Sequence, residues 1–270
     1  MKIKIAICCF LFLNVIKGKA QENVKPFVIG ETRVLKSNVL QEERTLNVYL
    51  PLGYDKEKSY PVIYLLDGSS NEDFLHIVGL VQFYHMQFGM PDFLVVGIGN
   101  VDRKRDFTFH TDLEDLKKEY PTTGHSAKFI EFVEKELQPY VNSVYKTTET
   151  KYLIGQSLGG LLATEILLKK PNLFTHYLIV SPSLWWDDES LLKNAKSLLE
   201  KQKEMNQYVY VSVGMKEHKM MVKEAKEIAA VLQLKKGLKV DYYPMEKEDH
   251  ASILHLSINE AFKKLFPLKE

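Results

Sequence analysis

Residues 151–168 read KYLIGQSLGGLLATEILL, an apolar run that leads through Gly155-Gln-Ser157-Leu-Gly159 into an apolar helical pattern. A Gly-x-Ser-x-Gly sequence between a strand and a helix is typical of a nucleophile elbow, a sharp turn that exposes a serine hydroxyl at the carboxyl end of a sheet. The motif alone should arise by chance in roughly one chain of this length in ten. Its strand-to-helix context therefore carries the prediction that Ser157 is a nucleophile.

A serine hydroxyl needs a base to remove its proton, and after such an elbow the partners follow in the order acid, then histidine. Two histidines, His250 and His255, follow the last predicted strand. His250 lies in the polar loop EKEDHAS before the terminal helix and is the predicted general base. His255 falls inside that helix, where a packed or surface histidine is expected.

The acid that orients the histidine is expected after the preceding strand. Glu217 is the first carboxylate there, in the segment VYVSVGMKEH. The alternative for Glu217 is a solvated glutamate in the first turn of the next helix, where the helix dipole favours negative charge. Asp249, Asp187 and Asp188 are the competing candidates for the acid.

Two backbone N–H groups are expected to bind the oxyanion that develops on the substrate, because losing one such donor typically costs ~10²–10³ in rate. Leu158, directly after the serine, is the first candidate. Ser69 is the second, because Gly68 in the segment LLDGSS lets the backbone turn the next N–H inward. The alternative for Asp67-Gly68 is an ordinary turn.

Strand-like and helix-like segments alternate along the rest of the chain. Apolar runs of strand length occupy residues 46–50, 62–66, 93–98, 152–154, 177–180, 208–213 and 240–243, and apolar helical stripes occupy 127–141 and 222–234. This alternation implies a mostly parallel sheet. Residues 27–50 lack an intervening helix and are expected to form an antiparallel edge. The order fits an α/β-hydrolase, although periodicity alone does not separate that fold from other doubly wound sheets.

Length and composition predict one domain behind a signal peptide. The chain has 270 residues, 45% of them hydrophobic, which suffices for one sizeable core. Residues 1–20 combine a basic start, an apolar run and small residues before Gln21, which is a signal-peptide pattern. The apolar run is shorter than the ~20 residues of a membrane anchor, the alternative interpretation. We expect cleavage after residue 20, one domain at 21–270, and a periplasmic or extracellular location.

Charge and cysteine content narrow the function classes. Residues 21–270 carry 32 Lys and Arg against 35 Asp and Glu, a net charge of −3 with interspersed signs. That charge balance provides no excess of basic residues with which to bind nucleic acid or an anionic membrane surface. Both cysteines lie within residues 1–20, so the mature chain has no cysteine-bound metal. Small-molecule chemistry without metal or cofactor is the leading class.

Several segments, in this order, resemble an esterase family that includes bacterial enterobactin and related siderophore esterases. They are YLLDG at 64–68, VVGIGNVDRKRDFT at 95–108, ELQPY at 136–140, the elbow and SPSLWW at 181–186. Mycolyltransferases, feruloyl esterases and S-formylglutathione hydrolases are more distant relatives. The resemblance implies an α/β-hydrolase fold and an acyl-serine intermediate without metal or cofactor, and it matches His250 and Glu217 to the base and acid positions. The chain departs from the family where Phe109, rather than proline, follows Thr108.

Substrate contacts are expected from two segments. Residues 100–123 are polar with little periodicity, which indicates a long loop over the substrate site. In it, Arg103 and Arg105 either grip an anionic or catecholate-bearing acyl group or pair with aspartates of the same segment. Trp185 and Trp186 either line the cleft or anchor the core.

The sequence thus predicts a serine carboxylic-ester hydrolase acting on a small-molecule ester, and the family resemblance implies a siderophore-type lactone as that ester. An acyltransferase and a carbohydrate-ester (feruloyl or acetyl) esterase are the alternatives within enzymes. A non-catalytic binding protein on the same scaffold is the alternative from another class. The sequence does not indicate an oligomeric state.

Overall fold

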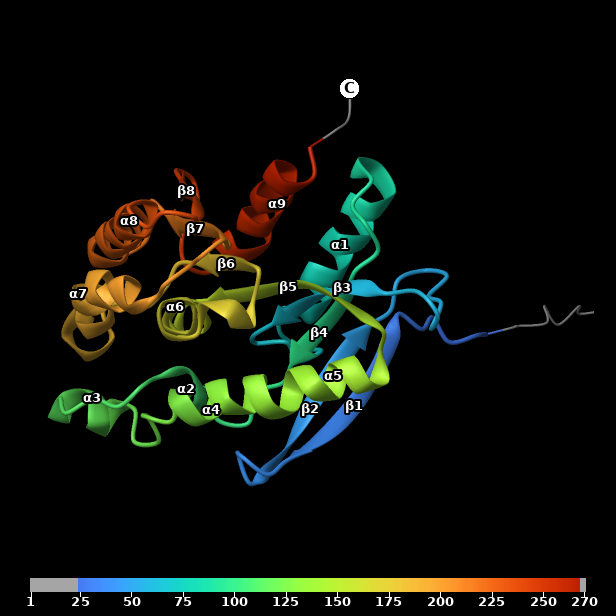
Figure 1. Ribbon diagram of the computed structural model, residues 1–270, viewed down its shortest axis with the longest axis horizontal. Coiled ribbons are helices and arrows are strands. Elements are labelled where there is room, and N and C mark those ends of the chain that lie inside the picture. Colours follow the sequence, from blue (N-terminus) through green and yellow to red (C-terminus); the bar gives the residue numbers. More distant parts are fainter. Residues whose placement is uncertain (1–23, 268–270) are drawn as a thin grey trace, which may run out of the picture.

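A central eight-stranded sheet with helices on both faces forms the protein, as Figure 1 shows for the computed structural model, which describes residues 24–267. The predicted signal peptide lies outside the described residues. The strands are β1 (Gly30–Ser37), β2 (Glu42–Tyr49), β3 (Tyr60–Leu65), β4 (Leu94–Ile98), β5 (Thr147–Gln156), β6 (His176–Val180), β7 (Tyr208–Gly214) and β8 (Lys239–Met245).

The strand order is β1-β2-β4-β3-β5-β6-β7-β8. β1 pairs antiparallel with β2, and β2 pairs antiparallel with β4. All other pairings in the sheet are parallel. The antiparallel edge and the parallel body both agree with the sequence prediction.

Helices cover the two faces of the sheet unequally (Figure 1). They are α1 (Phe74–Phe88), α2 (Arg103–Phe107), α3 (Glu114–Glu119), α4 (Ser126–Phe132), the π-helical turn η1 (Val133–Leu137), α5 (Gln138–Val144), α6 (Leu158–Lys169), the 3₁₀ turn η2 (Pro171–Leu173), α7 (Trp186–Lys201), α8 (Lys219–Gln233) and α9 (Ile253–Leu265). α1 and α9 pack on one face, and α4 to α8 pack on the other. No helix within residues 24–267 has the length and apolar character needed to cross a membrane.

Side chains of the inner strands point alternately to the two faces of the sheet and pack into two hydrophobic cores, one on each face. In β3, Val62 and Tyr64 join the larger core under α4 to α8, whereas Ile63 and Leu65 join the core under α1 and α9. Because successive strand residues point to opposite faces, a strand that is covered on both sides must be apolar throughout. This explains why these strands appear in the sequence as continuous apolar runs.

Two sequence predictions need correction. Residues 100–123 are not a plain loop, because they contain the short helices α2 and α3. Helices of five and six residues are too short to show an apolar period, although Asp102 caps α2 by accepting the Arg105 N–H at 3.0 Å.

The helix predicted at 127–141 is interrupted by η1. Pro139 lacks the N–H that a regular helix would donate to Lys135, which accounts for an irregular turn just before it.

Candidate active site

Three strand ends meet at one edge of the sheet. Ser157 follows β5, Asp67 follows β3 and His250 follows β8, and the carboxyl ends of parallel strands share an edge. A hollow of ≈ 360 Å³ opens there, lined by Asp67, Glu72, Asp73, Arg103, Gln156, Ser157 and His250. The structure therefore brings the predicted nucleophile and the predicted base to one hollow.

The backbone at Ser157 has the strained geometry of an elbow. Its φ of 60° and ψ of −121° lie where a side chain is rarely tolerated. A Cβ on Gly155 would come within 2.4 Å of the Gly159 carbonyl oxygen, so position 155 requires glycine. The Ser157 hydroxyl lies 3.3 Å from Ser183 Oγ. No hydrogen bond joins Ser157 to His250 among the described residues, so the two side chains must approach each other before a proton can pass between them.

The imidazole of His250 is oriented by a buried carboxylate. His250 Nδ1 and Glu217 Oε2 are 2.7 Å apart, and the Glu217 side chain is fully buried. The other oxygen accepts the Gly214 N–H at 2.8 Å and the Ser181 hydroxyl. Burial by itself raises the pKa of Glu217, but the hydrogen bonds from His250, Ser181 and Gly214 outweigh it and lower the pKa. The carboxylate is thus held ionised against the imidazole.

The competing acids are engaged elsewhere. Asp249 accepts the N–H groups of Ala251 and Ser252 at 2.9 and 3.0 Å. Asp187 accepts the Thr111 hydroxyl at 2.7 Å. Asp188 pairs with Lys193 at 2.7 Å. Of the four candidate acids, Glu217 is the one in contact with His250.

The main chain beside His250 is tied to the elbow. Gln156 Nε2 donates to the His250 carbonyl oxygen at 2.5 Å. His255 lies in α9, as expected, and its exposed ring stacks on His76 with 5.5 Å between the centroids. The two histidines that follow β8 therefore have different surroundings, and only His250 lines the hollow.

The turn after β3 presents the second candidate oxyanion donor. Gly68 packs against β4 so closely that a Cβ on it would meet Gly97 Cα at 2.3 Å, and its N–H donates to Ile98 O at 3.0 Å. The next N–H, that of Ser69, donates to a carboxylate oxygen of Glu72 at 3.3 Å. Leu158, the other candidate donor, is the first residue of α6. Sequence reasoning anticipated the turn but not the carboxylate beside it.

Arg103 lines the hollow, with its guanidinium bound to a neighbouring carboxylate. Its Nε and Nη2 donate to the two oxygens of Asp67 at 2.6 and 2.8 Å, and Nη2 also donates to the Gln156 carbonyl at 3.3 Å. Asn100 donates to the same Asp67 carboxylate at 2.7 Å. Arg103 thereby links the Asp67–Ser69 turn to the residue that precedes Ser157.

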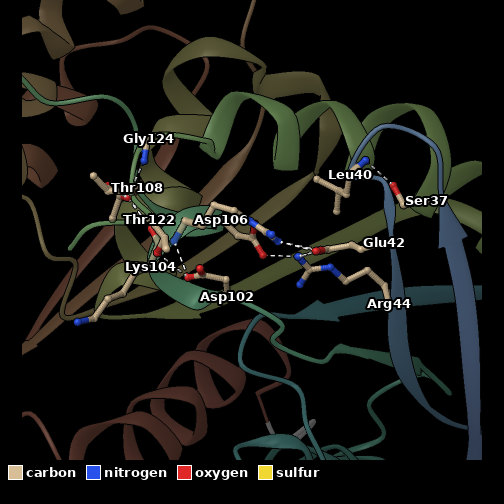
Figure 2. A network of polar contacts seen from close by, with 12 residues as sticks. Ser37, Leu40, Glu42, Arg44, Asp102, Lys104, Asp106, Thr108, Thr122 and Gly124 are labelled. Atoms are coloured by element: carbon tan, nitrogen blue, oxygen red, sulfur yellow. Dashed lines mark hydrogen bonds and ion pairs between the residues drawn. The ribbon is translucent and has the colours of Figure 1, made fainter. Parts of the chain in front are cut away.

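Arg105 does not line the hollow and belongs to a partly buried ionic network. It donates to Asp106 at 2.8 Å and to both oxygens of Glu42 at 2.8 and 2.9 Å. Figure 2 shows Arg44, which is fully buried, bonded to Glu42 and to Asp106. Internal pairing is therefore the correct one of the two interpretations of Arg105. The network anchors α2 to β2 and so holds the segment that carries Arg103.

Neither tryptophan is among the residues that line the hollow. Trp186 is fully buried, and its Nε1 donates to Phe109 O at 2.9 Å. This burial removes Trp186 from any surface that a substrate can contact. Trp185 is half-buried, packs against Tyr120 with 6.2 Å between the rings, and is not among the residues that line the hollow.

Asp73 adds a third carboxyl group to the hollow. Burial raises its pKa to about 6, and the negative charges of Asp67 and Glu72 add to the effect. Sequence reasoning missed this acidic lining and also missed Ser181 and Ser183. The polar pair Ser181-Pro-Ser183 directly follows β6, next to the elbow strand, and that position was the available signal.

Two further features of residues 24–267 bear on where chemistry could take place. No three His, Cys, Asp or Glu side chains there are grouped so as to hold a metal ion. A larger hollow of ≈ 590 Å³ lies at the amino ends of the strands. It is lined by Asn172, Lys203, Glu204, Met205, Asn206, Lys235, Lys236 and Gly237, none of which is a serine or histidine.

Known proteins resemble this chain over most of its length. A family model described as "Putative esterase" matches residues 37–253. Ferri-bacillibactin esterase BesA of Bacillus subtilis (strain 168) is 29% identical over 261 residues, which cover 88% of this chain and 90% of the relative.

Solved structures of hydrolases also resemble this chain over most of its length. An IroE-like serine hydrolase from Shewanella oneidensis superposes with a TM-score of 0.81 and 30% identity, covering 88% of this chain and 80% of that chain. The BES protein from Bacillus cereus has a TM-score of 0.79 and 28% identity, covering 93% of this chain and 100% of its own. These similarities confirm the predicted α/β-hydrolase fold and the resemblance noted from the sequence.

Proposed function

The chain belongs to the esterase family whose model covers residues 37–253, and from that premise we propose that it is a serine hydrolase of siderophore-type lactone esters. The observation that carries the proposal is the 2.7 Å contact between His250 and the buried, ionised Glu217, in the same hollow as the strained Ser157. Family membership makes the chain an esterase, which excludes the alternative of a non-catalytic binding protein.

The proposed reaction begins when the Ser157 hydroxyl rotates from Ser183 towards His250. Its oxygen attacks the ester carbonyl while His250 Nε2 takes the proton, and the N–H groups of Leu158 and Ser69 bind the resulting oxyanion. The ester C–O bond then breaks, and the imidazolium returns the proton to the departing alkoxide. Water repeats the sequence on the acyl-serine and releases the acid. Glu217 stabilises the imidazolium in both halves.

Hydrolysis needs water at the base, and the exposure of His250 allows it. The His250 side chain is 43% exposed, so water can approach the nitrogen that must activate it. The siderophore assignment is supported by the relative named a ferri-bacillibactin esterase, which aligns over most of this chain. Acyl transfer would require a sugar or other alcohol to outcompete water at the same position.

The test uses purified residues 21–270 with a catecholate trilactone and with p-nitrophenyl butyrate. Ser157→Ala should lower kcat on both esters by on the order of 10³-fold or more, because nucleophile and base act as one unit. Ser143→Ala, an exposed serine in α5, is the matched control and should retain full activity. Trilactone opening that survives in Ser157→Ala would contradict the serine mechanism. Activity confined to the simple ester would contradict the siderophore assignment.

A further inference from the structure

The proposed oxyanion donor Ser69 already has an acceptor in this structure. Its N–H donates to Glu72 Oε2 at 3.3 Å, and Asn100 Nδ2 donates to the two oxygens of the same carboxylate at 3.2 and 3.3 Å. The Glu72 N–H donates back to the Ser69 carbonyl at 3.0 Å, so the turn itself brings this side chain to the donor. A negative charge thus lies where the substrate oxyanion is expected to bind.

Within residues 24–267, the one cation that lines the hollow is bonded to Asp67 and acts on Glu72 only through space. Three carboxyl groups line the hollow, those of Asp67, Glu72 and Asp73, and Arg103 is the one arginine or lysine among the lining residues. Both nitrogens that Arg103 directs at a carboxylate are bonded to Asp67. Glu72 is held by neutral amide donors and lacks an ion pair among the described residues. Its charge therefore acts on whatever enters the hollow.

A carboxylate and an oxyanion compete for the Ser69 N–H in two ways. They require the same donor, and they repel each other at close range because the partly buried site screens charge less than water does. The carboxylate must therefore move away from the donor, or be neutralised, before the transition state can use the Ser69 N–H.

From this contact we infer that Glu72 is a specificity-determining residue of the esterase. Its carboxylate occupies the Ser69 N–H until a substrate brings a positive charge or an N–H donor that draws the carboxylate away. Esters with a cationic or amide-bearing arm beside the reacting carbonyl are preferred over esters that carry an anionic group at that same position. In a catecholate trilactone this position holds a neutral amide, and the catecholates lie farther from the ester. This inference rests on the proposed serine mechanism and assigns a substrate class to the same site.

The experiment compares three p-nitrophenyl esters whose acyl groups share a four-methylene chain and end in methyl, carboxylate or trimethylammonium. The wild-type kcat/KM should rank the cationic ester first and the anionic ester last. Glu72→Gln, which keeps the side-chain shape but removes the charge, should raise kcat/KM for the anionic ester and shrink the cation-to-anion ratio by about tenfold. Glu72→Ala, which also removes the acceptor, should shrink the ratio at least as far.

Glu149→Gln is the matched charge control. Glu149 is exposed near the amino end of β5, at the edge of the sheet opposite Ser157, so this variant changes the net charge equally without touching the hollow. Its cation-to-anion ratio should equal that of the wild type. Added salt should narrow the wild-type ratio more than the Glu72→Gln ratio, because screening acts on one charge fewer in the variant.

Each outcome decides the inference. If Glu72→Gln lowers kcat/KM equally for all three esters, or leaves the ratio unchanged, Glu72 only supports the turn and the inference is wrong. A wild-type preference for the anionic ester overturns it without any variant. Activity that persists in Ser157→Ala contradicts the proposed mechanism instead, so the two failures are distinguishable.

Discussion

Glu217 and Glu224 lie on either side of the start of α8, and both side chains are fully buried. Glu217 accepts hydrogen bonds from His250, Gly214 and Ser181, and its pKa is lowered. Neither carboxylate oxygen of Glu224 has a hydrogen-bond partner among the described residues. Burial, reinforced by the nearby Glu189 carboxylate, raises the pKa of Glu224 to about 8.

The opposite pKa shifts of Glu217 and Glu224 show that hydrogen-bond donors, rather than burial, decide whether a buried carboxyl is charged. Desolvation disfavours both carboxylates, but hydrogen bonds to the charged form reverse that effect at Glu217 alone. Asp106 is likewise buried and has a donor for each oxygen, one from Arg44 and one from Arg105. Asp73 lies between the extremes, with a pKa raised to about 6.

The largest expected effect is on catalysis at Glu217. Glu217→Gln preserves the shape but removes the charge that stabilises an imidazolium, so kcat for ester hydrolysis should fall on the order of 10²- to 10⁴-fold. Steady-state kinetics on p-nitrophenyl butyrate would measure it. Glu224→Gln is the matched variant and should change kcat less than about threefold, because the Glu224 side chain does not line the hollow. An equal loss of kcat in Glu217→Gln and Glu224→Gln would show that the charge of Glu217 has no special role in catalysis.

The next effect concerns stability at Glu224. Its folded pKa of about 8 lies above the ordinary 4.5, so between these values the folded chain holds a proton that the unfolded chain has released. The stabilising contribution is complete below pH 4.5 and is lost as the pH rises through 8. Glu224→Gln stays neutral and should exceed the wild type in unfolding free energy at pH 9 by on the order of 3 kcal/mol.

Urea unfolding at pH 5, 7 and 9 would measure the Glu224 effect. The difference between variant and wild type should grow with pH, since only the wild type ionises in the core. A difference that stays constant from pH 5 to 9 would indicate a packing effect, and the ionisation argument would then fail.

The smallest effect is expected at Asp73, which is only half-buried. Its folded pKa of about 6 is raised from the ordinary 3.8, so ionisation costs stability as the pH rises from 3.8 through 6. Asp73→Asn should add about 1 kcal/mol at pH 7.5, an estimate reduced for solvent screening, and nothing near pH 3.5. Thermal unfolding at the two pH values would measure it. A gain of the same size at pH 3.5 would show that the charge is not the cause.

Short-range patterns in the sequence were enough to predict the strands, the elbow and the loop that carries His250. The strand runs are apolar because the sheet is covered on both faces, and the elbow glycine at 155 is required by a 2.4 Å approach within the same turn. His250 could be placed at the hollow because a loop after the last parallel strand must emerge at the edge where Ser157 lies. Helices α2 and α3 escaped prediction because they are shorter than two helical turns.

Pairings between distant segments were decided only by the tertiary structure. Four acids were plausible partners for His250, and the contact at Glu217 arises because the loops after β7 and β8 come together although their residues are 33 positions apart. Neighbours from other elements likewise bury Trp186. They also supply the ion-pair partners of Arg105 and Arg103, which are Glu42 and Asp67. A side chain's local sequence sets its chemistry, but the donors and charges that surround it after packing set its ionisation and the group that it contacts.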